Sequence, residues 1–319
     1  MGIRCVVVLP ALLAASGALA AYPERAIRII VPYAPGGNID ITARTIAPGM
    51  SEALGQQIVI DNRGGAGGTL GSDIAAKSAP DGYTLLLGST GTLSTAPPLY
   101  SRLGYDPIKD FATTSLVSNV PLVLEMHPSI PARTVKEFIA LAKSRPGRIT
   151  MGSSGAGTTN HLSGELFQMA TGTRFIHVPY KGSGPGLVDL MGGQIDIFFD
   201  QLSASITYIQ AGKLHALAVT TLKRAAAMPE LPTIAESGIP GFDASTWTGV
   251  VMPAATPHDI VMKVHAALAK TLRTKATQDS FARLGAETLE STPEEFARFM
   301  RADLEKWTKV IRQAGIKLE

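Results

Sequence analysis

The sequence predicts an α/β protein built of two lobes, and three observations favour this fold class. Strand-like and helix-like stretches alternate from residue 27 onwards, which is typical of mostly parallel sheets covered by helices. The length of 319 residues allows two domains of roughly 100–200 residues each. Two similar strand–turn–helix segments, residues 27–44 and 148–166, lie about a domain apart, as expected if each lobe carries one.

The first twenty residues have the pattern of a secretory signal peptide. Arg4 precedes an apolar stretch over residues 5–19, and residues 18–20 (Ala-Leu-Ala) fit a small-residue cleavage site. The stretch is short for a membrane span, so we expect export and removal of residues 1–20. Cleavage also removes Cys5, the single cysteine, and leaves no thiol chemistry.

Composition excludes several classes of partner and cofactor. Hydrophobic residues make up 45% and charged residues 17% of the chain, as in compact globular proteins. The formal net charge of +3 is scattered, so we expect no nucleic-acid partner. His161 and Glu165, four residues apart, are better interpreted as a polar helix pair than as metal ligands. The glycine-rich residues 63–71 fit a dinucleotide fingerprint poorly and predict a tight turn, so we expect neither a metal nor a cofactor.

The first strand–turn–helix segment predicts an anion-binding turn. Residues 27–31 are a β-branched strand, prolines and glycines within residues 32–37 break it, and Asn38 or Asp40 can cap the following helix. Such a turn points backbone N–H groups outward at the positive end of a helix dipole, which makes a cradle for an anion. Because the turn contains no Lys or Arg, the expected guest is a modest anion such as a carboxylate.

The second segment has the same organisation. Residues 149–151 end a strand, residues 152–157 form the turn, and a polar residue at 158–160 caps the next helix. The G-x-S-x-G spacing of a nucleophile elbow is absent, so we interpret Ser153 and Ser154 as hydroxyl donors to a bound anion. An exported serine hydrolase that uses either serine with His161 is the alternative.

The remaining elements follow from apolar runs, caps and amphipathic patterns. Thr134 and Glu137 form a capping box, and Thr292 caps the last helix. Further strands are expected at residues 57–60, 83–87, 116–126, 175–178, 195–199, 214–220 and 248–252. Helices are expected at residues 40–54, 72–77, 134–144, 159–170, 187–191, 204–210, 257–275 and 293–314.

Two strands are expected to carry the chain between the lobes, residues 117–126 and 248–252. The first lobe is then formed by residues 21–120 and 249–319, and the second by residues 121–248.

Four further side chains are candidates for the site. Tyr33 and Tyr180 each lie at a strand–turn junction and are predicted to form pocket walls. Asp200 follows a strand, where ligands bind in open α/β sheets, although it can also cap the next helix. Asp40 is either an ordinary acid of a first helical turn or a residue that shapes the cradle or accepts a ligand amine.

Several motifs in order resemble the Bug receptors, the substrate-binding proteins of tripartite tricarboxylate transporters. They include PYAPGGNID, NRGGAGG, MGSSGAGTTNHLSGEL, HVPYKGSGPGLVDLMGGQIDIFFD and WTGVVMPAATP, and they cover essentially the whole mature chain. The resemblance implies a periplasmic Venus-flytrap fold, type II-like, with two crossover strands. It also implies a monomeric receptor without catalysis that delivers a small carboxylate to membrane permease subunits.

In that family two loops hold the ligand carboxylate, and they match residues 34–40 and 153–161 here. Glu125 departs from the family, because it enters a crossing strand that is usually apolar. The expected ligand is a di- or tricarboxylate, an amino acid or an aromatic acid, and a sensor subunit that presents the acid to a membrane kinase is a further alternative. The expected ligand-binding residues are Tyr33, Ala34, Gly36, Gly37, Asn38, Asp40, Ser89, Thr90, Ser153, Ser154, Gly157, Thr158, Thr159, Asn160, Tyr180 and Asp200.

Overall fold

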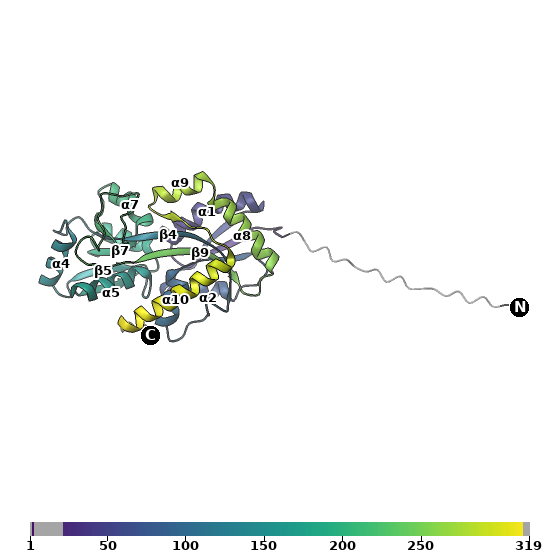
Figure 1. Ribbon diagram of the computed structural model, residues 1–319, viewed down its shortest axis with the longest axis horizontal. Coiled ribbons are helices and arrows are strands. Elements are labelled where there is room, and N and C mark those ends of the chain that lie inside the picture. Colours follow the sequence, from purple (N-terminus) through teal and green to yellow (C-terminus); the bar gives the residue numbers. More distant parts are fainter. Residues whose placement is uncertain (1, 3–21, 315–319) are drawn as a thin grey trace.

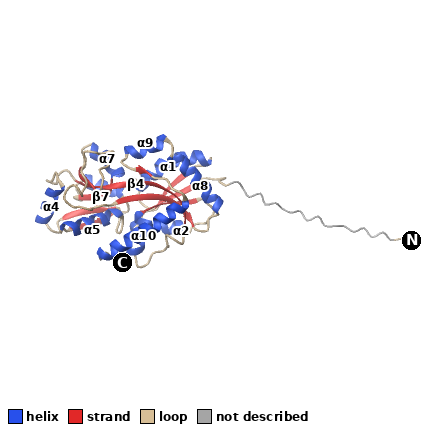
Figure 2. Ribbon diagram, viewed as in Figure 1, coloured by secondary structure: helices blue, strands red, loops and turns tan. Residues whose placement is uncertain are grey.

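The structure is a computed structural model that describes residue 2 and residues 22–314. The predicted signal peptide, residues 1–20, lies outside the described residues except for Gly2. Figure 1 shows an elongated body in which two long strands run lengthwise through the centre, and Figure 2 shows helices on both sides of the strands.

One end of the body is built on a sheet of order β2-β1-β3-β9-β4-β10. Its first three strands are parallel, and β9 runs antiparallel between β3 and β4. The strands are β1 (Ile27–Val31), β2 (Ile58–Asn62), β3 (Thr84–Ser89), β4 (Phe111–Met126), β9 (Ser245–Pro253) and β10 (Glu287–Thr288). The helices of this end are α1 (Asn38–Leu54), α2 (Thr69–Ala76), α3 (Ala96–Leu99), α8 (His258–Leu272), α9 (Lys275–Arg283) and α10 (Pro293–Ala314).

The other end is built on a sheet of order β8-β4-β7-β5-β6, in which β5 is parallel to both neighbours. The strands are β5 (Ile149–Ser153), β6 (Phe175–Pro179), β7 (Ile197–Gln201) and β8 (His215–Val219). The helices are α4 (Val135–Ser144), α5 (Thr159–Thr171), α6 (Ser183–Met191) and α7 (Leu202–Gln210).

Strand β4 takes part in both sheets. Residues 111–121 pair with β9, and residues 122–126 pair with β7 and β8. The change of partner falls at Pro121, which lacks the N–H needed for a continuous ladder. We refer to residues 22–121 and 245–314 as lobe 1 and to residues 122–244 as lobe 2.

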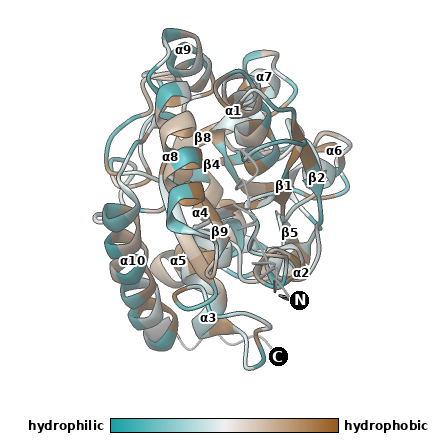
Figure 3. Ribbon diagram, turned by 90° about the vertical axis from the view of Figure 1, so that its right-hand side faces the viewer, coloured by the Kyte–Doolittle hydropathy of each residue, from teal (hydrophilic) through white to brown (hydrophobic). Residues whose placement is uncertain are grey.

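The largest apolar cluster lies mainly in lobe 1 and continues into lobe 2. In lobe 1, Ile29, Ile46 and Val250 belong to it and are fully buried, and Leu202 and Ile206 of α7 extend it into lobe 2. In lobe 2, Phe138 and Phe167 are fully buried in a second cluster, and each contributes about 1.5–3 kcal/mol by leaving water. Figure 3 shows the apolar strands in brown inside the body and hydrophilic residues in teal along α10.

One expectation about the elements is wrong. The single helix expected over residues 257–275 is two helices, because Thr274 has an extended backbone and its hydroxyl accepts a hydrogen bond from the Thr277 N–H at the start of α9. The stretch after β3, for which no element was predicted, is a π-helix over Thr90–Thr95 that continues into α3.

Helix α10 contacts both lobes. Trp307 and Ile311 are buried in one cluster with Leu99 of lobe 1 and Leu162 of lobe 2. The helix lies along the outside of the body in Figure 1. Among residues 22–314, no helix combines the length and the apolar composition that a membrane crossing requires.

Candidate functional site

A small cavity lies where the two lobes meet. Its volume is about 20 Å³, which is room for about one water molecule. A larger ligand therefore does not fit the cavity at the present distance between the lobes. Lobe 1 lines the cavity with Tyr33, Gly37, Asn38, Ile39, Ser89 and Thr246, and lobe 2 lines it with Ser154, Thr158, Thr159, Asn160, Ser183 and Gln201.

The turn after β1 is held in shape by Asp40. Its carboxylate accepts hydrogen bonds from the Gly36 N–H at 3.0 Å, from Arg44 Nε at 2.9 Å and from Asn62 Nδ2 at 3.1 Å. Burial raises the pKa of the Asp40 carboxyl, but these hydrogen bonds and the Arg44 charge outweigh burial and hold the pKa below its ordinary value. The acid is therefore used within lobe 1. The first N–H groups of α1 have no acceptor within the helix, and Gly37 at its N-cap lines the cavity.

The turn after β5 is held by hydroxyl groups. Gly155 and Gly157 have φ values of +141° and +76°, which glycine adopts far more readily than other residues. Thr158, the N-cap of α5, donates its hydroxyl to the Gly155 carbonyl at 2.7 Å. Ser154 Oγ donates to Asn160 Oδ1 at 2.5 Å. The N-terminus of α5 thus lines the cavity opposite that of α1.

Side-chain amides form the rear wall. Asn160 Nδ2 donates to Asp200 Oδ1 at 2.8 Å, and Gln201 Nε2 donates to Thr246 Oγ1 at 2.9 Å. The residues that line the cavity include no Lys, Arg or His. An anion in this cavity would therefore meet hydroxyls, amides and helix N-termini rather than a cation.

Hydrogen bonds around the cavity join the two lobes. Ala34 N donates to Lys181 O at 2.8 Å, and Ser203 Oγ donates to Asn38 Oδ1 at 2.6 Å. Thr95 Oγ1 donates to the Gly157 carbonyl at 2.8 Å. These bonds require the present distance between the lobes, so they break when the cavity opens.

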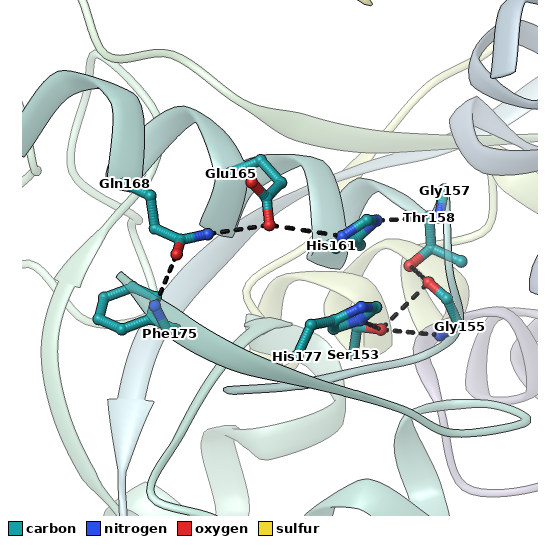
Figure 4. A network of polar contacts seen from close by, with 9 residues as sticks. All are labelled: Ser153, Gly155, Gly157, Thr158, His161, Glu165, Gln168, Phe175 and His177. Carbon is teal, nitrogen blue, oxygen red and sulfur yellow. Dashed lines mark hydrogen bonds and ion pairs between the residues drawn. The ribbon is translucent and has the colours of Figure 1, made fainter. Parts of the chain in front are cut away.

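A pair of stacked histidines supports the second turn from behind (Figure 4). The rings of His161 and His177 lie 3.9 Å apart, with 10° between their planes. His161 Nδ1 accepts from the Gly157 N–H at 3.1 Å, and Ser153 Oγ lies 2.6 Å from His177 Nε2. Burial, followed by the neighbouring His161, lowers the pKa of His177 to about 4, so the ring is neutral at neutral pH.

These contacts do not form the pair that the hydrolase alternative requires. That alternative joins Ser153 or Ser154 to His161, whereas Ser153 contacts His177 and Ser154 contacts Asn160. Ser153 is also fully buried and does not line the cavity.

The structure brings half of the residues predicted from the sequence to the cavity. Those that line it are Tyr33, Gly37, Asn38, Ser89, Ser154, Thr158, Thr159 and Asn160. Those that do not are Ala34, Gly36, Asp40, Thr90, Ser153, Gly157, Tyr180 and Asp200. Several of the second group have other partners: Tyr180 donates its hydroxyl to Asp189, and Thr90 Oγ1 accepts from the Trp247 N–H.

Four cavity residues were not predicted: Ile39, Ser183, Gln201 and Thr246. Gln201 was missed because neighbouring side chains of a strand point to opposite faces, and only the structure shows that Asp200 turns away from the cavity. Ser183 begins α6, four residues before the expected start of that helix. Thr246 belongs to lobe 1, and no pattern in the neighbouring sequence indicates that it lines the cavity.

Two α/β lobes joined through β4 and β9, with helix N-termini facing a cavity between them, define a two-lobed periplasmic binding protein. The predicted fold class is confirmed by solved structures that superpose closely. Periplasmic binding protein BugD is 37% identical, covers 93% of this chain and 100% of its own, and gives a TM-score of 0.91. The R. palustris protein Rpa4515, solved with adipate, is 38% identical, covers 93% of this chain and 99% of its own, and gives a TM-score of 0.90.

The family follows from the sequence comparison. The model described as "Tripartite tricarboxylate transporter family receptor" matches residues 42–316, so the chain belongs to this family. Protein BugT of Bordetella pertussis is 39% identical over 299 residues, which cover 93% of this chain and 92% of BugT. The resemblance to the Bug receptors is thereby confirmed. Among residues 22–314, no three His, Cys, Asp or Glu side chains are grouped so that they could hold a metal ion.

Proposed function

We propose that this protein is a periplasmic receptor that captures a small carboxylate between its lobes and delivers it to the permease subunits of a tripartite tricarboxylate transporter. The observation that carries the proposal is the pair of helix N-termini, those of α1 and α5, on opposite sides of one uncharged cavity. Family membership supports the delivery step. In this proposal the protein acts as a monomer and has no catalytic role.

The cavity offers enough donors for a carboxylate. Hydrogen bonds to a charged group contribute about 1.5–3 kcal/mol each, and a helix N-terminus adds about 0.3–1 kcal/mol. A micromolar receptor needs about −8 kcal/mol in net binding free energy. The Ser89 hydroxyl and the Asn38 amide, whose Nδ2 has no other partner among the described residues, line the cavity together with the first turns of both helices. Several such bonds reach the required value without a cation.

The bound adipate of Rpa4515 supports a dicarboxylate as the ligand class. In this chain the amides of Asn38, Asn160 and Gln201 also line the cavity. An amide can donate to a second carboxylate or pair with an amino or hydroxyl group. The proposed ligands therefore comprise di- and tricarboxylates, amino acids and aromatic acids.

A thermal-shift screen of residues 21–319 tests the proposal. Mono-, di- and tricarboxylates, amino acids and aromatic acids are the ligands, and the methyl ester of each positive acid is the control. A ligand at 100 times its Kd stabilises the folded state by about 2.7 kcal/mol, which raises the melting temperature by several degrees. The screen is repeated after unfolding and refolding to remove carried-over ligand. No shift with any acid in either preparation would refute the proposal.

A further inference from the structure

Two fully buried carboxyl groups lie behind the cavity, Glu125 on β4 and Asp200 on β7. In the antiparallel pairing of these strands, Val123 lies opposite Asp200 and Glu125 lies opposite Phe198. The two acids are therefore diagonal neighbours on the same face of the sheet. Diagonal neighbours have Cα atoms about 7–8 Å apart, within reach of long side chains.

The pair has few hydrogen-bond partners. Both carboxyl oxygens of Glu125 and Oδ2 of Asp200 lack a hydrogen bond of good geometry to any residue that the structure describes, and the nearby Ser205 hydroxyl on α7 lowers the pKa of Glu125 only against the larger effects of burial and of Asp200. Within the part of the chain that the structure describes, no Lys, Arg or His forms an ion pair with either acid. Burying an unpaired charge costs several kcal/mol, and two adjacent carboxyls do not readily ionise together.

Titratable groups on the neighbouring elements are engaged elsewhere or face away. His215 on β8 lies opposite Met126 and so on the other face of the sheet. The others are Asp189 on α6, which accepts from Tyr180; Asp40 on α1, which pairs with Arg44; His161 on α5, which accepts from Gly157; and the half-buried Tyr208 on α7.

Burial and mutual repulsion keep protons on the pair. Burial, and then the Asp200 charge, raise the pKa of Glu125 well above its ordinary value. Burial also raises the pKa of Asp200 to about 7, although hydrogen bonds from Ser183, the Gln201 backbone and Asn160 act against burial. Near neutral pH the pair therefore holds between one and two protons, and its titration belongs to both groups.

Asp200 connects the pair to the cavity. Its Oδ1 accepts from Asn160 Nδ2 at 2.8 Å and from Ser183 Oγ at 2.5 Å. Both donors line the cavity, so a charge on Asp200 lies one side chain away from a bound anion. Repulsion between a carboxylate ligand and an ionised Asp200 is strong in such a buried place, because the local dielectric is low.

We propose that Glu125 and Asp200 form a buried acid pair that couples carboxylate binding to the uptake of one proton at Asp200, with Glu125 staying protonated as a positioning residue. The inference rests on the proposed carboxylate receptor. The proton comes from solvent and neutralises Asp200 when the anion enters. Affinity therefore falls as pH rises above 7, by up to about tenfold per pH unit while the coupled group titrates.

Isothermal titration calorimetry with adipate, or with the acid that gives the largest shift in the screen, tests the coupling. Titrations at pH 7.5 in two buffers of different ionisation enthalpy give the number of protons taken up per ligand. The wild type is expected to take up a fraction of a proton, approaching one, and Asp200→Asn is expected to take up none. Asp189→Asn is the control, because it removes a different acid, on α6; this variant is expected to take up as many protons per ligand as the wild type. No uptake by the wild type, or undiminished uptake by Asp200→Asn, would overturn the proposal.

Glu125→Gln tests the second half of the proposal, because an amide imitates a protonated carboxyl. At pH 6.5 the variant is expected to bind and unfold like the wild type. Raised acid pKa values make the wild type lose stability as pH rises, so at pH 9 the variant is expected to be the more stable protein. A stability difference that is the same at both pH values would mean that Glu125 has a structural role only.

The two tests also separate this inference from the proposed function. If no acid binds, the receptor proposal and the coupling fail together, while the unfolding curves of Glu125→Gln still decide whether the buried pair holds its proton. If an acid binds without proton uptake, the receptor proposal stands and the coupling is refuted.

Discussion

Gly184→Ala is expected to block closure of the lobes while leaving each lobe intact. Gly184 lies in the first turn of α6, in lobe 2, and faces Pro35 of lobe 1. A methyl group at position 184 would lie 2.1 Å from the Pro35 carbonyl oxygen, whereas ordinary contact begins at 3.4 Å. The two nearest atoms, the carbonyl oxygen and carbon of Pro35, belong to the backbone, so they cannot move aside without moving the chain. The lobes must therefore separate by about 1.3 Å, the shortfall from ordinary contact distance.

That separation has a calculable effect on binding. It breaks the bonds from Ala34 N to Lys181 O and from Ser203 Oγ to Asn38 Oδ1, now 2.8 and 2.6 Å long, because a contact beyond about 3.5 Å is no longer a hydrogen bond. Each lost bond costs about 0.5–1.5 kcal/mol. Closure, and binding that requires it, is then weaker by about 1–3 kcal/mol, or about 5- to 150-fold in Kd.

The same substitution is expected to change stability by no more than about 1 kcal/mol. Alanine has the higher helix propensity by about that amount, but position 184 lies in the first turn of α6 and precedes Pro185, which disfavours the helical backbone for a residue with a Cβ atom. Binding therefore falls while the protein stays folded, which a general folding defect would not produce. Calorimetry gives the Kd of the screened acid, and urea unfolding gives the stability.

Gly192→Ala is the matched control for this experiment. Gly192 is the C-cap of the same helix with a φ of −81°, and a methyl group there would meet nothing closer than 3.4 Å, within its own helix. The control is expected to bind like the wild type. If Gly184→Ala also binds like the wild type while folded, the contact between Gly184 and Pro35 is not part of the ligand-bound form, and the reasoning is refuted.

Three further predictions concern the two turns. Thr158→Val removes the hydroxyl that donates to the Gly155 carbonyl and so fixes the second turn at the cavity, and it is expected to weaken acid binding about tenfold in calorimetry; an unchanged Kd would place the carboxylate elsewhere. Asp40→Ala leaves the Gly36 N–H without its acceptor and is expected to lower the free energy of unfolding by about 1–3 kcal/mol at pH 7. Because the pKa of Asp40 is lowered in the folded state, that deficit is expected to shrink in urea titrations below pH 4, and a constant deficit would contradict the assignment. His177 has a pKa lowered to about 4, so the wild type is expected to lose stability as pH falls from about 6.5 towards 4; His177→Gln is expected to lose less, and equal losses would refute this.

The local parts of the site could be predicted from the sequence. Glycines, prolines and caps determine a strand–turn–helix unit within about 15 residues, so the segments that became β1–α1 and β5–α5 were found where the structure has them. The N-terminal residues of α1 and α5, including Asn38 and Thr158, line the cavity as expected.

The parts that depend on side-chain direction and on contact between lobes could not be predicted from the sequence. The pattern at the end of β7 marked Asp200, but the strand turns that side chain to the rear and presents Gln201 to the cavity. A shift of one residue reverses the face of a strand, and a short apolar run does not determine which face is inside. Thr246 joins the cavity only because β9 brings it next to lobe 2.

Glu125 shows how a local departure gains meaning from its neighbours. In the sequence it is an acid in an apolar strand, for which only an effect on rigidity could be expected. The pairing of β4 with β7 places it diagonal to Asp200, where it is fully buried. An ionised acid at this place would cost several kcal/mol, so the surroundings favour the protonated form that the proposal assigns to Glu125.

The position of α5 explains why ligand capture and closure are one event in the proposed receptor. A single helix N-terminus contributes only about 0.3–1 kcal/mol to anion binding, so high affinity requires both helices to reach the same carboxylate ligand. They do so only while the lobes touch. Leu162, in the first turns of α5, packs against Trp307 and Ile311 of α10, a helix that is continuous with lobe 1. Opening the cavity must therefore also disturb this contact, so α10 helps to hold α5 against lobe 1 in the closed form.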